Sequence, residues 1–408
     1  MKNIACIVSA IICMCLLSGC RGRQNGSEDS VKGGGSPLIV YDMESALLHP
    51  TDSFTLNDIA SSVRLVRLKT PADVFVSTFR FQVIPFGEGF AVSSAAGNSP
   101  VESILLFDEN GQYLKPALIR GHGHGELPRI WNWSVCMDTL YALGDKTMLQ
   151  YSTDGRIGQI AKEPDMITDV VPLKSRWLVY LPPWTLMSEH STSLDLKFLD
   201  RLKGTVQTRS MPLPATSQER LLDYPGLDKG NMERAILSAT HDGMVLFKNI
   251  YNDTLYRIAS PGEVYPEAVF HTGRFRSRPQ YAEDRHKKEK TVMIDVISET
   301  DHHLIVRCLF HGEKHLTIWD KRSGNNVASL PMRYKGSFAE QCYISPIWYR
   351  TPSGKRVVVN LLGFGKGRLL AGLMPEHASE IFPASVLEED PQDENPVLLE
   401  IVLNSIEM

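Results

Sequence analysis

The sequence is short of three features, and each shortage excludes a class of protein. Its 408 residues include only seven cysteines, too few for a disulfide-rich secreted scaffold of this length. Its formal net charge is −4, so it lacks the strong positive field on which non-specific phosphate binding depends, and we expect no nucleic-acid partner. Few stretches show helical periodicity, which excludes a helical bundle. With 43% hydrophobic residues, the chain can still bury a large core.

Residues 1–19 have the pattern of a cleaved signal peptide. Lys2 gives a positive start, and an apolar run follows at residues 4–17. At about 1.5 Å per helical residue this run spans only about 21 Å of a roughly 30 Å hydrocarbon core, so it indicates a signal rather than a membrane span. It ends in Leu17-Ser18-Gly19-Cys20, which resembles the bacterial lipobox. The resemblance implies cleavage before Cys20 and a lipid on its thiol. The alternative is a plain secretory signal with an incidental cysteine.

Residues 20–37 are predicted to be the lipidated cysteine and a flexible tether, because this Gly-rich and polar stretch cannot bury a core. The folded body is then expected over residues 38–408. Three of the seven cysteines lie in the predicted signal peptide and Cys20 is predicted to carry the lipid, so Cys136, Cys308 and Cys342 remain in the body. Three is an odd number, so at least one is unpaired, and their apolar, strand-like surroundings favour thiols of the core.

The body repeats a unit of short β-strands. Apolar runs with a period of two alternate with turns rich in Gly, Asn, Asp and Pro. The clearest hairpin has an apolar run at residues 104–107, a turn at 108–111 and a return strand from Tyr113. Similar hairpins recur along the chain. The apolar residues before their turns are Phe107, Tyr151, Leu199, Ile258 and Trp319.

The spacing of these hairpins, about 45 to 60 residues, is typical of propeller blades with four antiparallel strands. The roughly 350 residues from Ser62 onward hold six such blades better than five or seven. We therefore predict an all-β fold, a six-bladed β-propeller that follows the signal and tether. Its last blade is expected to include either the C-terminal strand at 397–402 or the early strand at 63–68. The alternative, two β-sandwich domains, would need a central linker that we do not find.

Three segments resemble the six-bladed β-propeller lipoproteins of Bacteroidetes. Phe107-Asp108 with Gly111 matches the family's F-D-x-x-G strand end. Residues 121–126 match its G-x-G-P-G-E stretch, with His124 where proline is usual. Residues 252–256 match its N-D-T-(I/V)-Y segment almost letter for letter. The resemblance implies the propeller fold and a location in the cell envelope. It implies little about function, because the family is largely without assigned chemistry.

No catalytic, metal or cofactor signature stands out. The glycine run at residues 121–125 lacks the further glycine and the lysine of phosphate-binding loops. We therefore interpret it as a crossing between blades whose backbone conformation requires glycine. His122 and His124 could share a metal, but nothing supplies a third ligand. His311 and His315 are predicted to flank a turn rather than to share a helix face. We therefore assign no metal, no cofactor and no catalytic residue.

Polar and aromatic residues outside the strands suit recognition at a propeller mouth better than proton transfer. They predict a non-catalytic binding module for a glycan, a peptide or an envelope protein. Two alternatives stay open, an enzyme that acts on glycans or peptides and a structural partner in an envelope assembly. The basic run at 274–290 is either a solvated loop or part of the recognition face. The candidate ligand-binding residues are Arg120, His122, His124, Trp131, Trp184 and Arg276.

The lipid predicted at Cys20 places the protein in the cell envelope, with the membrane as its first partner. A bacterial lipoprotein carries several acyl chains, which hold far more firmly than one. Arg21 and Arg23 stand where surface-exported lipoproteins of Bacteroidetes tend to have acidic residues. We therefore predict the outer membrane with the body facing the periplasm, and surface exposure is the alternative.

Overall fold

The computed structural model describes residues 38–51, 53–74, 76, 82–94, 102–123, 125–144, 147–162, 169–181, 193–212, 235–240, 242–249, 251–278, 290–331, 346–365, 368–373 and 397–404. Cys20 and the predicted signal and tether lie outside these residues, so they stay predictions. Within the described part of the chain, no helix is long and apolar enough to cross a membrane.

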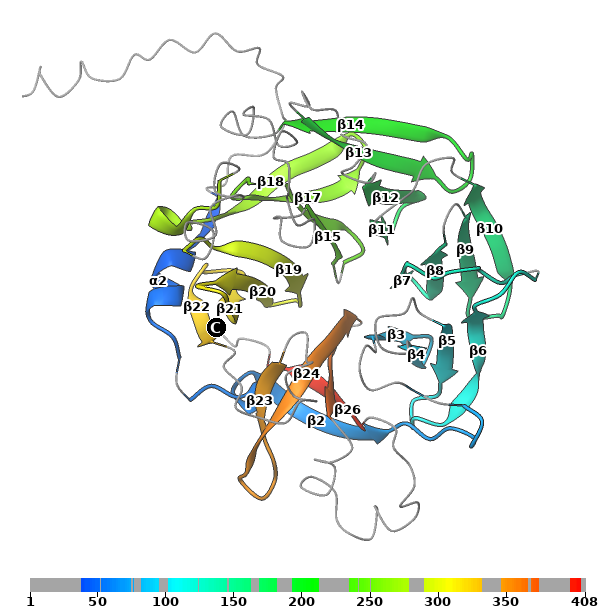
Figure 1. Ribbon diagram of the computed structural model, residues 1–408, viewed down its shortest axis with the longest axis horizontal. Coiled ribbons are helices and arrows are strands. Elements are labelled where there is room, and N and C mark those ends of the chain that lie inside the picture. Colours follow the sequence, from blue (N-terminus) through cyan, green and yellow to red (C-terminus); the bar gives the residue numbers. More distant parts are fainter. Residues whose placement is uncertain are drawn as a thin grey trace, which may run out of the picture. The chain divides into compact units, whose positions relative to one another are not determined.

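The described strands form six sheets around a ring, which confirms the predicted six-bladed propeller (Figure 1). The four strands of each of the first five blades pair antiparallel in chain order, and the first of them lies nearest the middle of the ring (Figure 1). The first three blades are β3 (Gln82–Phe86), β4 (Gly89–Ser94), β5 (Ser103–Phe107) and β6 (Tyr113–Ile119); β7 (Asn132–Cys136), β8 (Thr139–Leu143), β9 (Thr147–Ser152) and β10 (Ile157–Lys162); β11 (Asp169–Pro172), β12 (Trp177–Leu181), β13 (Ser193–Asp200) and β14 (Val206–Pro212). Blades four and five are β15 (Ile236–Ala239), β16 (Val245–Lys248), β17 (Thr254–Ser260) and β18 (Glu263–Phe270); β19 (Met293–Glu299), β20 (His303–Phe310), β21 (Glu313–Asp320) and β22 (Asn326–Pro331).

The sixth blade is built from both ends of the body. The C-terminal strand and the early strand were predicted as alternatives, and the structure uses both, with Leu65 opposite Leu399. The inner strand is β24, whose residues 360–363 border the ring's centre, while β23 pairs only with its other half. Pairing the two ends closes the ring and leaves no place for two separate sandwich domains. The strands of this blade are β23 (Pro346–Arg350), β24 (Arg356–Gly365), β25 (Arg368–Leu373), β26 (Val397–Leu403) and β2 (Ala60–Arg67).

The recurrent hairpins are the outer hairpins of blades one to five, as predicted. Local turn chemistry fixes the first of them. The Asp108 Oδ1 atom accepts the backbone N–H groups of Asn110 and Gln112, both at 2.9 Å. Gly111 has a φ of +81°, a left-handed conformation that suits glycine. The side chains before the five turns are all buried between blades, and they are Phe107, Tyr151, Leu199, Ile258 and Trp319.

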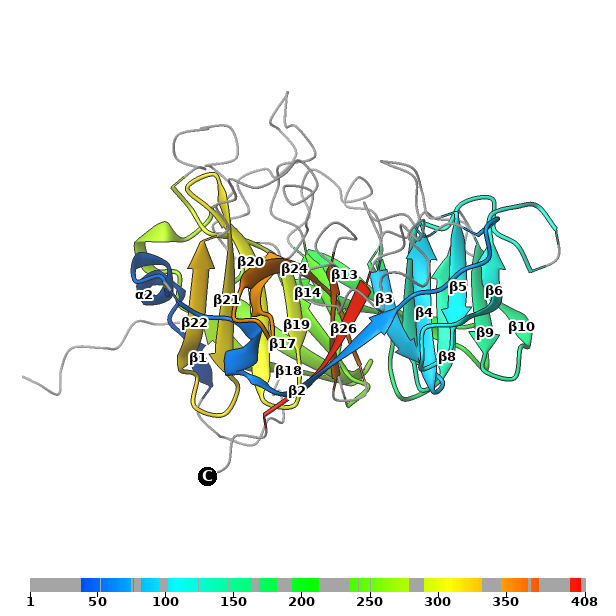
Figure 2. The same ribbon diagram turned by 90° about the horizontal axis from the view of Figure 1, so that it is seen from below.

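Residues 38–69 pass along the outer strands of several blades, which the sequence did not predict. β1 (Ile39–Tyr41) pairs in parallel with β18 of blade four, and helix α2 (Met43–Leu48) follows it. Beyond β2, the Lys69 N–H group donates to the Gly111 carbonyl of blade one at 2.8 Å. Figure 2 shows this segment running across the outside of the ring toward blade one. It therefore ties together blades that are distant in the sequence.

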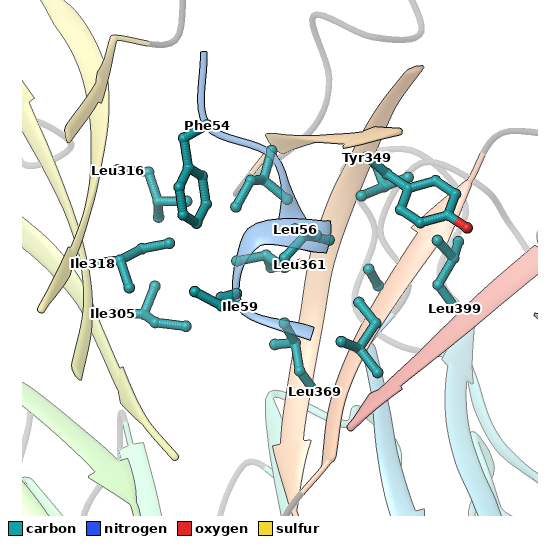
Figure 3. Close-up of a cluster of buried hydrophobic side chains, with 14 of the residues drawn as sticks. Phe54, Leu56, Ile59, Ile305, Leu316, Ile318, Tyr349, Leu361, Leu369 and Leu399 are labelled. Carbon is teal, nitrogen blue, oxygen red and sulfur yellow. The ribbon is translucent and has the colours of Figure 1, made fainter. Parts of the chain in front are cut away.

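The same segment fills the space between blades five and six. A short 3-10 helix at Leu56–Asp58 places the apolar side chain of Leu56 there, and the side chains of Phe54 and Ile59, just outside the helix, join it (Figure 3). Each such side chain, when fully buried, contributes about 1.5–3 kcal/mol. The N-terminal segment is thus part of the core and not an appendage. The residues in contact include Phe54, Leu56 and Ile59 of the segment, Ile305, Leu316 and Ile318 of blade five, and Leu361, Leu369 and Leu399 of blade six.

A cluster of paired charges joins blades four and five. The Arg257 Nη2 atom lies 2.8 Å from Glu299 and 2.7 Å from Glu267. The Lys321 Nζ atom lies 2.8 Å from the same Glu299 carboxylate, whose side chain is completely buried. Lys321 also donates to the Thr300 carbonyl at 2.9 Å. Each of these buried charges therefore has an opposite charge beside it.

Two body cysteines lie in the described part of the chain, and both are free thiols. Cys308 is fully buried, and desolvation raises the pKa of its thiol, so it stays protonated and unreactive. Burial also raises the pKa of Cys136, which is partly exposed at the end of β7. The prediction of a core thiol is confirmed for Cys308 and holds only in part for Cys136. Cys342 lies outside the described residues.

Candidate functional site

The inner strands of all six blades surround a central cavity of about 440 Å³. Where it borders the cavity, each inner strand has a partner strand on one side only, so its other backbone edge faces the cavity. The volume falls within the usual range of ligand pockets, roughly 300–1,000 Å³. Much of the wall is apolar, including Ile84, Val171 and Leu237. The polar side chains of the wall come from five of the blades and are Gln82, Asn132, Ser134, Ser238, Ser298, Arg307 and Asn360.

Trp133 and Ser134 also line this cavity, and each holds a buried polar atom without a hydrogen-bond partner. Both belong to β7, where they pair with Ala142 and Tyr141 of β8. Their exposed fractions are 2% and 9%. The Trp133 Nε1–H group can only donate, whereas the Ser134 hydroxyl can donate and accept. A buried polar group left without a partner costs about 1–3 kcal/mol, so these two atoms are not explained by the fold.

The cavity wall is electrically balanced. Arg307 is the one ionisable side chain among the described residues that line it. Its guanidinium is held by Asp295, at 2.8 Å from Nε to Oδ1 and 2.6 Å from Nη2 to Oδ2. Such a two-pronged contact fixes the guanidinium plane and neutralises its charge. The wall therefore offers hydrogen-bonding groups without an excess of either charge.

The predicted residues Arg120 and His122 lie in the crossing from blade one to blade two. The Arg120 Nε atom donates to the Pro128 carbonyl at 3.1 Å, so this side chain ties the crossing together. The Gly123 N–H group donates to Glu126 Oε2 at 2.8 Å, and a Cβ atom at Gly121 would lie 1.9 Å from the same oxygen. The glycine run thus encloses the chain's own carboxylate. His122 is exposed beside it.

Trp131 ends the same crossing, and Arg276 lies in another one. Trp131 directly precedes the cavity-lining strand β7, is 45% exposed, and has the Arg129 guanidinium 5.5 Å from its ring. Arg276 lies between blades four and five, with its Nε atom 3.0 Å from Asp253. Burial raises the pKa of Asp253, and the charge of Arg276 opposes that rise. The structure does not bring Arg120 or Arg276 to the cavity wall. His124 and Trp184 lie outside the described residues.

Sequence reasoning missed the cavity residues because most of them are divided among six inner strands, with only two to four from each. No motif spans them, and Trp133 and Ser134 resemble ordinary residues of a buried strand. One signal was available. Several inner strands carry an amide or a hydroxyl beside apolar residues, as at Gln82, Ser298 and Asn360. In a propeller, the inner strands of all blades meet at the axis, so polar residues on them converge.

His311 and His315, the histidine pair that lies wholly in the described part of the chain, belong to no metal-binding cluster there. Among the described residues, no three His, Cys, Asp or Glu side chains gather closely enough to hold a metal ion. His311 lies in the tight turn between β20 and β21 with a φ of +52°, which confirms the predicted turn. The rings of His311 and His315 both pack edge-on against Phe310, with centroids at 4.1 Å and 5.6 Å.

Comparison with known proteins gives a family and a fold. The family profile described as "Domain of unknown function (DUF4934)" matches residues 38–359. No curated protein matches the chain. A solved structure of a protein from Bacteroides fragilis NCTC 9343, described as exported, is 14% identical with a TM-score of 0.63, covering 90% of this chain and 100% of its own. A member of the DUF4221 family from Bacteroides vulgatus ATCC 8482 is 10% identical with a TM-score of 0.52, covering 85% and 97%. At these identities the likeness shows the fold alone.

Proposed function

The chain belongs to the DUF4934 family, whose function is unassigned, and from its six-bladed propeller we propose that it is a non-catalytic binding module whose ligand occupies the central cavity. One observation carries this proposal. Trp133 and Ser134 are among the residues that line the cavity, and each has a buried polar atom with no partner within the described structure. A ligand that bonds to these atoms would offset their desolvation, which the fold alone leaves uncompensated.

The chemistry of the wall supports binding over catalysis. General acid–base catalysis needs titratable groups beside the reacting atoms. Among the described lining residues, only Arg307 can ionise, and Asp295 already holds it. A purely structural role would instead rest on a broad apolar patch on the outer faces of the blades. A ligand in the cavity would account for the polar side chains on the inner strands, whereas a role for the outer faces would not account for them.

We further propose that the body is held at the outer membrane through a lipid on Cys20, facing the periplasm. The lipobox-like residues support this, and so does the likeness to a Bacteroides protein described as exported. Cys20→Ala should leave an uncleaved or soluble species, because the acyl chains provide the anchor. Cell fractionation checks this. If the processed variant still sediments with membranes as the parent does, the anchor is not at Cys20.

A thermal-shift screen with oligosaccharides, peptides and divalent metals tests the binding proposal. A ligand at 100 times its dissociation constant adds about 2.7 kcal/mol to stability, a shift that is easily seen. Any hit is then measured on Ser134→Ala and Trp133→Phe, which remove the two unpartnered polar atoms. Ser329→Ala is the matched control, because Ser329 Oγ is also buried without a partner but lies in the outer strand β22. A hit with unchanged affinity for both cavity variants would contradict the proposal.

A further inference from the structure

The polar groups of the central cavity restrict the chemistry of what can bind there. We infer that the cavity takes an uncharged saccharide, of mono- or disaccharide size, that accepts hydrogen bonds from Trp133 Nε1 and Ser134 Oγ. This inference rests on the proposed function and adds the class of ligand to it.

Charge is the first restriction. The described wall contains amides, hydroxyls, one indole N–H group and apolar side chains, and its one guanidinium is held by Asp295. An ionised ligand that entered would lose its hydration without meeting an unpaired opposite charge, which is costly. A neutral ligand avoids this cost. The cavity therefore favours neutral ligands over acidic or basic ones.

Donor and acceptor types are the second restriction. Trp133 Nε1 only donates, so the ligand must present an acceptor there. Ser134, and the amides of Gln82, Asn132 and Asn360, belong to side-chain types that both donate and accept. Sugar hydroxyl groups also do both, so a sugar can donate to side chains of these types or accept from them without one fixed orientation of its donors.

The distribution of the polar groups is the third restriction, and it separates a sugar from a peptide. The polar side chains come from five of the six blades, so they stand around the cavity, and apolar residues separate them. A pyranose ring carries hydroxyls around its rim and apolar C–H faces, which fits this arrangement. An extended peptide could pair with the edge of one inner strand. Its other edge would then face isolated side chains and lose hydrogen bonds.

Size agrees with this assignment. The 440 Å³ cavity lies at the small end of the range for ligand pockets. A long chain of sugars or amino acids could place only one end in it.

Isothermal titration calorimetry of the purified protein tests the inference. The neutral probes are glucose, galactose, mannose, N-acetylglucosamine and their disaccharides. Glucuronic acid and glucosamine are charged analogues of the same size, and tripeptides of uncharged residues form a third group. We expect at least one neutral sugar to bind at least about tenfold more tightly than its charged analogue. Ser134→Ala should weaken that binding about three- to tenfold, the usual effect of losing one hydrogen bond. Ser329→Ala should leave it unchanged.

The outcomes separate the ligand class from the site. Equal or tighter binding of the charged sugars, or binding of the tripeptides alone, would overturn the saccharide assignment. If that binding is still weakened by Ser134→Ala, the cavity remains the binding site and the proposed function stands. If none of the probes binds, the saccharide assignment is overturned as well. Sugar binding that neither Ser134→Ala nor Trp133→Phe weakens would place the ligand elsewhere and contradict both proposals.

Discussion

Two buried polar regions of this propeller differ in whether their side chains have partners. Between blades four and five, Arg257 and Lys321 each contact the Glu299 carboxylate at 2.8 Å. In the central cavity, Trp133 and Ser134 hold buried polar atoms that contact no donor or acceptor of the described structure. A buried charge with its partner is accounted for by the fold. A buried polar atom that has no partner, in a residue that lines a cavity, points to a molecule that is not part of the fold.

The difference separates stability from function. Removing one member of a paired cluster leaves an uncompensated buried charge, so it should damage folding and spare binding. Removing an unpartnered atom takes away a desolvation cost, so it should spare folding and damage binding. The predictions below test this contrast, beginning with the largest effect.

Glu299→Ala should have the largest effect on stability. It leaves Arg257 and Lys321 without the carboxylate that both contact, and breaking a buried ion pair typically costs about 3–5 kcal/mol. Urea unfolding measures the loss. Glu88→Ala, in the exposed turn between β3 and β4, is the control and should leave the midpoint unchanged. If both variants unfold at the same urea concentration, the cluster does not hold the two blades together.

Gly363→Ala should disturb the cavity wall itself. A Cβ atom at Gly363 in β24 would lie 2.1 Å from the Val83 carbonyl oxygen in β3, so blades six and one would have to separate. Overpacking of this kind costs about 1–3 kcal/mol, and we expect it to weaken ligand binding too. Gly262→Ala is the control, because a Cβ there meets no atom within 4 Å. Equal stability of the two variants would show that blades one and six can accommodate the added methyl group, and it would contradict this prediction.

Acid should weaken blade five through His303. Desolvation lowers the pKa of this buried side chain, and the charge of Asp320 opposes that change only in part. The unfolded chain takes up a proton at this histidine near pH 6.5 while the folded chain does not, so stability should fall as pH drops from about 7 to about 5. The stability of the His303→Gln variant, measured by urea unfolding, should fall less over the same pH range. Identical pH slopes for parent and variant would contradict this.

Ligand affinity should stay flat over the same pH range. Arg307, the only ionisable side chain of the described wall, remains protonated throughout. A calorimetric affinity that changed steeply between about pH 7 and about pH 5, for a ligand with no titrating group of its own, would reveal an ionisable group in the site.

Ser134→Ala should have the smallest effect on stability, within about 0.5 kcal/mol of the parent, because no protein partner is lost. Ser329→Ala should behave in the same way in thermal unfolding. The two variants should differ only in ligand binding. A loss of stability above about 1.5 kcal/mol in Ser134→Ala alone would give this hydroxyl a structural role instead.

The parts of the fold that were predictable depend on local chemistry. Asp108 and Gly111 specify a turn through their own side chain and backbone, so this hairpin can be recognised from four residues. β1 could not be recognised that way. Ile39–Tyr41 is extended because it lies along β18, more than two hundred residues later in the chain. The closure of blade six shows the same limit, since the sequence offered two candidate strands and only their mutual pairing shows that both are used.

The candidate site was predictable only in its general position. The sequence pointed to loop residues, but Arg120 bonds to the crossing in which it lies, and Arg276 bonds to Asp253. Trp131 lies next to the cavity only because the inner strand begins at the following residue. The cavity residues are brought together by ring closure, which no local pattern encodes.

Hydrogen–deuterium exchange with and without the ligand that most raises the melting temperature tests the central claim most directly. The backbone edges of the inner strands face the cavity, so a ligand there should slow the exchange of amides in β7 and in the inner strand opposite it, β19. The outer hairpins, such as β5–β6, should exchange as before. Slowed exchange confined to the outer strands or to the crossings, with β7 unchanged, would contradict binding in the central cavity.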